Sequence, residues 1–225
     1  MNKLIIYSLL GSMLLTHIVD AKNIAIVGAK VYTMSSQGTL ENATVLIKDG
    51  KIQKIMEGEP ALAGYEIIVA KGKVVTPGLI GASTTLGLVD VGFSGGTNDS
   101  NSSLTSISKT GAAFDVSYAI NPDSSLMAIA RIEGVTTAAT SMGSTGQLFS
   151  GQGALISLGD VSEPVIQARA FISTRVGNSG ADTMGGSRSV LWVSLEKAFS
   201  EAKFAFGKSL TPIYYCHFFL SLSDI

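Results

Sequence analysis

Histidine, cysteine and charged residues are all scarce in this sequence. Its 225 residues include two histidines and one cysteine, and only 15% are charged. One cysteine cannot form an internal disulfide, so packing alone must hold the fold together. The formal net charge of −1 provides no basic field of the kind that binds nucleic acid or an anionic membrane. The composition instead contains 46% hydrophobic residues and 25 glycines, which favours buried strands joined by tight turns.

The few bases and nucleophiles do not assemble into a catalytic pattern. A Ser-His-Asp triad needs a histidine base, and no Gly-x-Ser-x-Gly motif precedes His217. Cys216 beside it does not indicate a thiol nucleophile, because adjacent residues of a strand point to opposite faces. The glycine-rich stretch 143–153 has no Lys-Ser/Thr pair after Gly151, as a phosphate-binding P-loop requires, so a turn between strands is favoured.

Residues 1–21 have the composition of a signal peptide. Lys3 precedes an apolar run over 4–15, and Val19-Asp20-Ala21 offers small or apolar residues at the cleavage positions. The run is shorter than the about 20 residues needed to span a bilayer. We therefore expect cleavage after Ala21, export to a periplasmic or extracellular compartment, and no transmembrane anchor in the mature chain.

Residues 22–77 have the pattern of a small β-sandwich subdomain. "IAIVGAKVYTM" is a β-rich run, and "ATVLIKDGKIQKIME" predicts a hairpin that turns at Asp49-Gly50, because these residue types tolerate positive φ. Ile52 and Ile55 depart from strict alternation, which indicates a bulge after the turn. A further strand pair is expected around Lys71-Gly72-Lys73.

The stretch that follows mixes a long loop with helices and strands. Residues 88–112 are rich in Gly, Ser, Asn and Thr, and predict a long loop. "LMAIARIEG" predicts a short helix after the capping-type residues 121–124, and "VTTAATS" and "ALISLGD" predict strands. Residues 190–206 carry apolar side chains at helical spacing, which favours a helix packed on the core over a partner-binding helix.

Residues 208–225 differ abruptly from the helix before them. They are aromatic and apolar, and no lysine or arginine follows Lys208. The segment is either a buried terminal strand or the translation of a shifted reading frame. The sudden change of composition directly after a regular helix favours the second interpretation.

Three motifs, taken in order, carry a family resemblance. The hairpin with Asp49-Gly50, then "GKVVTPGLIGASTTLG", then "EGVTTAATSMGS" resemble the amidohydrolase superfamily, in particular its secreted imidazolonepropionase-related branch. The resemblance spans residues 23–206. It implies an α/β fold in which a small β-sandwich over 22–77 precedes a (β/α)8 TIM-type barrel. Because a full barrel takes about 250 residues, residues 78–207 are expected to form an incomplete one.

The same resemblance bears on metal binding. It places Ser83 and Thr85 where family members carry the two histidines of a His-x-His motif, and Gly81 where they carry an aspartate. Family members typically bind zinc or another divalent metal, for which neutral hydroxyls are poor ligands. No cofactor is therefore supported for this chain, and the standard metal site is not expected.

Four residues are candidates for substrate binding: Ser83, Thr85, Asp90 and Asp99. If the strand register holds, Ser83 and Thr85 face the barrel centre and could hydrogen-bond a ligand. Asp90 and Asp99 flank the loop after the first barrel strand, at the end where barrel enzymes build their sites. Solvated loop carboxylates are nevertheless the favoured interpretation of these two and of Asp115 and Asp123. No catalytic residue is identified.

The resemblance implies hydrolysis of non-peptide carbon–nitrogen bonds by an exported protein. The chain alone is expected to be inactive, since the standard metal ligands are replaced. The alternatives are a non-catalytic exported protein that binds a small amide-type ligand, and a degenerate fragment without function. An unfinished barrel would leave strand edges unpaired, which predicts association through those edges.

Overall fold

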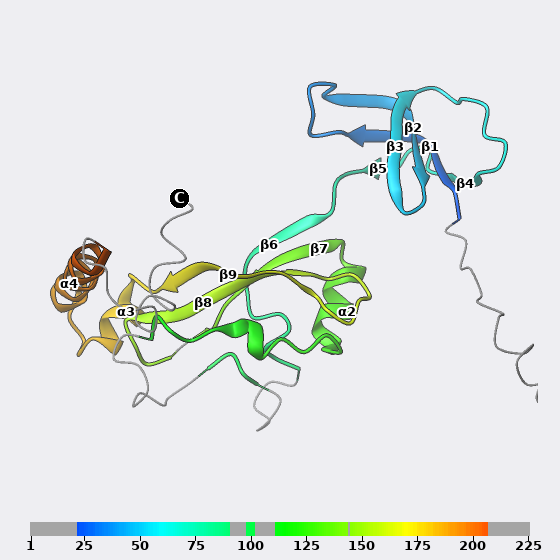
Figure 1. Cartoon of the computed structure of the whole chain (residues 1–225). Coiled ribbons are helices and arrows are strands. Elements are labelled where there is room, and N and C mark those ends of the chain that lie inside the picture. Colours follow the sequence, from blue (N-terminus) through cyan, green and yellow to red (C-terminus); the bar gives the residue numbers. More distant parts are fainter. Residues whose placement is uncertain (1–21, 91–97, 102–110, 144, 207–225) are drawn as a thin grey trace, which may run out of the picture. The chain divides into compact units, whose positions relative to one another are not determined.

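The computed structural model describes residues 22–90, 98–101, 111–143 and 145–206. The chain divides after Pro77 into two compact units, unit 1 up to Pro77 and unit 2 from Gly78 onward. Figure 1 labels the strands of both units and the α-helices of unit 2. The signal peptide expected over 1–21, the tail over 208–225 and most of the long loop fall outside the described residues.

Unit 1 is built on one five-stranded sheet with the order β3-β2-β1-β4, in which β5 also pairs with β1. Its strands are β1 (Ile24–Tyr32), β2 (Thr39–Lys48), β3 (Lys51–Glu57), β4 (Glu66–Val69) and β5 (Val74–Val75). Small side chains of β1 and β2 form the core together with Ala70: Ala29, Val31, Ala43 and Val45. The described part of unit 1 contains no second sheet, so the two facing layers of the expected β-sandwich are not found there.

The hairpin between β2 and β3 turns at Asp49-Gly50, as predicted. Both residues have positive φ, 51° and 73°, which a tight primed turn requires. The register of the hairpin slips after Leu46, where Gln53 is the extra residue of β3. The predicted bulge is therefore confirmed, and it lies between the two isoleucines whose spacing indicated it.

The strands around Lys71-Gly72-Lys73 do not pair with each other. β4 and β5 both run parallel to β1, β4 along its first half and β5 along Lys30 and Val31. A tight turn, in which Lys73 N donates to Ala70 O at 2.9 Å, returns the chain to the same edge of β1. Instead of pairing with each other as expected, these two short strands thus pair one after the other with the same edge of β1.

Unit 2 contains a four-stranded sheet with the order β6-β7-β8-β9. The strands are β6 (Leu79–Thr84), β7 (Val135–Thr140), β8 (Phe149–Ser157) and β9 (Val165–Thr174). β6 and β7 are parallel, whereas β8 and β9 each run antiparallel to the strand before. Only β6 and β7 match the all-parallel pattern of a (β/α)8 barrel, so the expected partial TIM barrel is not confirmed.

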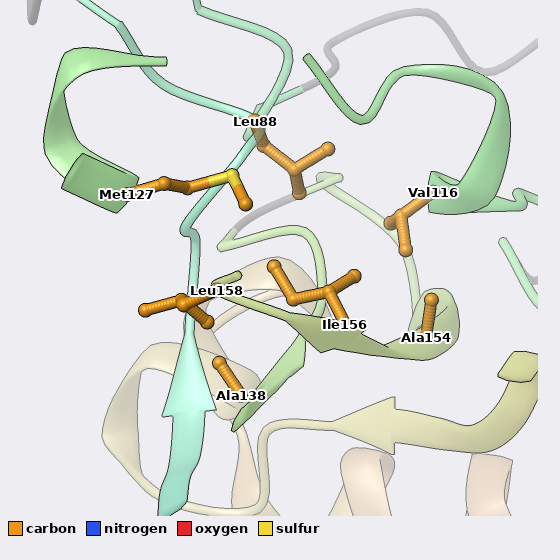
Figure 2. Close-up of a cluster of buried hydrophobic side chains, with 7 residues drawn as sticks. All are labelled: Leu88, Val116, Met127, Ala138, Ala154, Ile156 and Leu158. Carbon is orange, nitrogen blue, oxygen red and sulfur yellow. The ribbon is translucent and has the colours of Figure 1, made fainter. Parts of the chain in front are cut away.

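The helical elements of unit 2 are η1 (Val116–Tyr118), α2 (Ser125–Ile132), α3 (Asn178–Thr183) and α4 (Arg188–Phe206). The predictions of α2 and α4 are confirmed. Figure 2 shows the main core, where side chains from η1, α2, β7, β8, the residue after β8 and the turn after β6 meet: Leu88, Val116, Met127, Ala138, Ala154, Ile156 and Leu158. A second cluster packs Leu191, Leu195 and Ala198 of α4 against Ala112, Leu148 and Phe149. Among the described helices, none combines the length and the apolarity needed to cross a membrane.

β8 begins inside the stretch 143–153 that was expected to be a turn, because residues 149–153 already belong to the strand. Its glycines allow close packing on both sides. A Cβ on Gly151 would lie 2.7 Å from Phe114 O, and a Cβ on Gly153 would overlap the ring of Phe171. These glycines therefore serve the packing of the strand rather than a loop.

Candidate functional site

The C-terminal ends of β6 and β7 lie next to each other because the two strands are parallel neighbours. Hydroxyl residues end both strands: Thr84 Oγ1 donates to Ala139 O at 3.2 Å, and Thr140 Oγ1 donates to Leu86 O at 2.8 Å. In α/β folds, ligands bind beyond the carboxyl ends of parallel strands. This C-terminal edge is therefore the candidate site.

Ser83 and Thr85 lie at this edge, but their orientation departs from simple alternation. Ser83 is an exposed residue of β6, and the half-buried Thr85 follows the strand. The register with β7 slips between Gly81 and Thr84, so β6 carries an extra residue there. A bulge of this kind re-aims the side chains around it. It interrupts the alternation on which a shared orientation of Ser83 and Thr85 depends, and their contact with a ligand stays a prediction.

Asp90 is engaged with the first turn of α2. Its Oδ1 accepts hydrogen bonds from the backbone N and the Oγ of Ser125, both at 3.0 Å. Ser124, the N-cap residue, donates its hydroxyl to Val89 O at 3.0 Å instead of capping the helix itself. A carboxylate at a helix N-terminus is favourable, because it accepts from free backbone N–H groups and interacts with the helix dipole. Asp90 thus joins the turn after β6 to α2.

Asp99 is exposed, and its backbone N donates to Leu88 O at 2.7 Å. A β-bridge between Val89 and Asn98 brings its segment beside that of Asp90. The neighbouring Ser100 is buried, and its N and Oγ both donate to Asn98 Oδ1, at 3.0 and 2.6 Å. The structure therefore places Asp90 and Asp99 near the same edge, with only Asp90 engaged through its carboxylate.

A partly buried ion pair lies elsewhere in unit 2. Asp115 Oδ2 is 2.7 Å from Arg169 Nε, and the two side chains are 3% and 27% exposed. Asp115 Oδ1 accepts from Ser117 N at 3.0 Å and from Ser117 Oγ at 2.6 Å, and Arg169 Nη2 donates to Tyr118 Oη at 3.3 Å. The interpretation of Asp115 as a solvated carboxylate was wrong, because η1 folds it against β9.

The ion pair is held by strong local forces. Burial by itself raises the pKa of Asp115, but hydrogen bonds from Ser117 and Arg169 outweigh it, so the pKa lies below its ordinary value. Arg169 adopts a left-handed φ of 54° at a register slip of β9. Such a conformation costs about 1–3 kcal/mol and persists only where the surroundings enforce it. The pair therefore fixes η1 across the sheet. A charged residue inside the apolar run "VIQARAFIST" was the signal that could have revealed it.

The residues of this part of the chain do not fit a divalent metal site. Residues 22–206 contain neither histidine nor cysteine. Within the described residues, no three or more Asp or Glu side chains gather closely enough to hold an ion. At the C-terminal edge the side chains offered are the hydroxyls of Ser83 and Thr85 and the exposed carboxylate of Asp99, and the Asp90 carboxylate is already bound to Ser125. Zinc prefers imidazole, thiolate or carboxylate ligands, of which this set supplies a single free carboxylate.

The structure of this chain is similar to that of an amidohydrolase from Thermotoga maritima. The TM-score is 0.67 at 21% sequence identity, and the match covers 82% of this chain and 48% of the other. The chain therefore shares its fold with part of the Thermotoga protein. It spans about half the length of the Thermotoga protein.

Other solved structures match shorter stretches. A putative prolidase from Bifidobacterium longum is 32% identical over 29% of this chain and 17% of its own, with a TM-score of 0.26. A molinate hydrolase is 28% identical over 32% of this chain and 15% of its own, also with a TM-score of 0.26. Matches this short carry no weight for fold or function. No family model and no curated protein matches the chain, so the imidazolonepropionase-related branch stays a prediction.

Proposed function

We propose that this chain recognises a small amide-type molecule at the C-terminal edge of β6 and β7 and does not hydrolyse it by itself. One observation carries the proposal. The chain shares the fold of part of an amidohydrolase, yet the edge where the resemblance expects metal-binding histidines presents the hydroxyls of Ser83 and Thr85. Hydroxyls bind amides well but do not replace the nitrogen ligands of a metal that activates water.

The hydroxyls at the edge divide into two groups. Thr84 and Thr140 donate to backbone carbonyls of the two strands and so hold the edge together. Ser83 and Thr85 make no hydrogen bond through their side chains to another described residue, which leaves them for a ligand. A hydroxyl both donates and accepts, so it can pair with the carbonyl oxygen or the N–H of an amide. Asp90 and Asp99 flank these residues as further candidate contacts.

Hydrolysis of a non-peptide carbon–nitrogen bond is the second candidate function. It is favoured by the fold match, in which this chain spans about half of the Thermotoga amidohydrolase. The activity would belong to a longer form or an assembly in which other residues supply the reactive groups. In the sheet of unit 2, β6 is an edge strand with Leu79 and Ile80 more than half exposed, and we propose it as the point of association. We also propose export, on the basis of residues 1–21.

Thermal unfolding of the full chain with a panel of small amides tests both candidates. We expect some amides to raise the melting temperature without product formation and without stoichiometric metal, because a ligand that binds only the folded state stabilises it. The double variant Ser83→Ala/Thr85→Ala should lose this shift, whereas the matched change of two exposed residues of unit 1, Ser36→Ala/Thr39→Ala, should keep it. Stoichiometric zinc together with amide hydrolysis would instead establish the second candidate.

A further inference from the structure

Three large aromatic side chains form a stripe along α4. Trp192, Phe199 and Phe206 recur at intervals of seven residues, which places them on one side of the helix. They are 57%, 50% and 65% exposed. The neighbouring side of α4 is buried, and its apolar side chains are Leu191, Leu195, Ala198 and Ala202. The aromatic stripe therefore extends the apolar surface of the helix beyond the part that packs on the sheet.

The aromatic stripe is large enough to bind another segment. An aromatic side chain can bury about 150–250 Å², so the exposed part of these three amounts to roughly 300 Å². Exposed apolar area of this size marks an interaction surface. Phe199 already meets the ring of Phe149 edge-on, with ring centroids 6.3 Å apart. A partner on the stripe would thus extend the cluster that α4 forms with the start of β8 (Figure 1).

The sequence that follows α4, outside the described residues, supplies an apolar partner. Residues 213–222 contain no Asp, Glu, Lys or Arg. In an extended strand, successive side chains point to opposite faces. One face of this segment would be apolar throughout, with the side chains of Tyr214, Cys216, Phe218, Leu220 and Leu222. The opposite face would include His217 and Ser221. This alternation is typical of a strand that packs one face on an apolar surface.

The lengths of α4 and of this segment match. The 19 residues of α4 span about 28 Å and end at Phe206. The ten residues 213–222, fully extended, span about 33 Å. Gly207 and Pro212 lie between the two segments, and these residue types are typical of a helix end followed by a change of direction. The segment can therefore turn back and run along the whole helix.

The charges at the start of α4 suit the same arrangement. Arg188 is exposed there and makes no ion pair with another described residue. A segment that runs back from Phe206 would bring Asp224, the only acidic residue after Lys208, toward this end of the helix. A carboxylate near Arg188 would pair with the guanidinium and interact favourably with the helix dipole.

We propose that residues 213–222 pack as an extended strand along the aromatic stripe of α4. The apolar face that contains Phe218 contacts the helix, and the face that contains Phe219 points away from it. The occupant of the stripe is thus a segment of the same chain, in agreement with the interpretation of residues 208–225 as a buried terminal strand. With the stripe covered, α4 is buried on two sides, as a helix with apolar residues around most of its circumference requires.

The full chain contains its own probes of this contact, because its one tryptophan, Trp192, lies on the stripe and its one cysteine, Cys216, lies on the proposed strand. We expect acrylamide to quench Trp192 fluorescence weakly and a thiol reagent to react slowly with Cys216. Phe218→Asp should raise both toward the values of the urea-unfolded chain, since a carboxylate is unfavourable against an apolar surface. Phe219→Asp is the matched control and should leave both unchanged. Far-UV circular dichroism checks that each variant keeps its helices.

A change on the helix provides the reciprocal test and leaves the segment itself intact. Trp192→Ala should increase the reactivity of Cys216, whereas Val193→Ala, at an exposed position on another side of α4, should not. The proposal is overturned if the Phe218 and Phe219 variants behave alike, if Trp192 is fully quenched in the native chain, or if Trp192→Ala leaves Cys216 unchanged. Protection of Trp192 that rises with protein concentration would also overturn it, because a second copy would then cover the stripe.

Discussion

Next to η1, Asp115 and Arg169 form a partly buried ion pair, whereas the C-terminal edge of β6 and β7 carries the neutral hydroxyls of Ser83 and Thr85. Both regions belong to unit 2. The first uses its strongest electrostatic interaction to fix a short helix across the sheet. The second keeps groups that can hydrogen-bond a ligand but cannot by themselves activate water. The comparison shows that a carboxylate in this fold need not have a catalytic or ligand-binding role, because the group it pairs with determines its role.

Removing the buried carboxylate should produce the largest effect. Asp115→Ala leaves Arg169 partly buried without its counter-ion, and we expect a loss of about 3 kcal/mol in the free energy of unfolding, at the lower end of the range for broken buried pairs because Arg169 keeps some exposure. Urea unfolding followed by circular dichroism measures it. The exposed Asp99→Ala should change stability by no more than about 0.5 kcal/mol. Equal losses would remove the contrast between the two regions.

A substitution that disturbs the packing of β8 against the residues before η1 should have the second largest effect on stability. Gly151→Ala forces a side chain into a left-handed φ of 95° and against Phe114 O, and we expect a loss of about 2 kcal/mol. Gly143→Ala, near the edge, provides the control, because its Cβ makes only ordinary contacts. Thermal unfolding of both variants compares them. A similar fall in melting temperature for the two would show that residues 111–118 are not held against β8 as described.

Removing the Asp90 carboxylate should have a smaller effect on the free energy of unfolding. Asp90→Ala removes the acceptor for the N and Oγ of Ser125, and a lost helix cap costs about 1 kcal/mol. Asp90→Asn should keep most of the stability, because its amide oxygen can still accept. Unfolding in urea measures both variants, with Asp123→Ala as the control from the loop before α2. A loss as large as that of Asp115→Ala would contradict the smaller structural role assigned to Asp90.

The pH dependence of stability should give the smallest effect, since burial opposes the hydrogen bonds of Asp115. Its pKa in the folded chain lies below the ordinary value of 3.8, so the folded state binds this proton more weakly than the unfolded state. The resulting stabilisation is present above that ordinary value and is lost as the pH falls through the folded pKa. Urea midpoints measured from neutral to strongly acidic pH should therefore fall more steeply for the native chain than for Asp115→Asn. Parallel curves would contradict the lowered pKa.

Local signals in the sequence predicted local structure. Asp49-Gly50 indicated the hairpin, the spacing of Ile52 and Ile55 indicated its bulge, and apolar periodicity indicated α4. The register of the parallel pair could not be predicted, because the slip between Gly81 and Thr84 depends on β7, more than fifty residues further along the chain. Without the register, the orientation of the side chains at the C-terminal edge could not be predicted either.

The antiparallel pairing of β8 and β9 and the ion pair between Asp115 and Arg169 were missed for a similar reason. Gly159-Asp160 and Pro164 are turn-type residues that could have indicated a hairpin between β8 and β9. The partner of Arg169 lies 54 positions away, and no periodic pattern links the two residues. Asp115 was recognised as a candidate carboxylate, but its burial follows from tertiary packing alone.

The parallel pairing of β6 with β7 also has a consequence for the order of folding. The hairpin of unit 1 closes between neighbouring residues, whereas Thr84 bonds to Ala139, 55 positions later. Contacts between distant residues form late, because a long loop must close first. During synthesis at about 5–20 residues per second, β6 waits on the order of seconds for its partner strand. For that interval β6 has no partner strand on either edge, because β7 is its only neighbour among the described strands of the sheet.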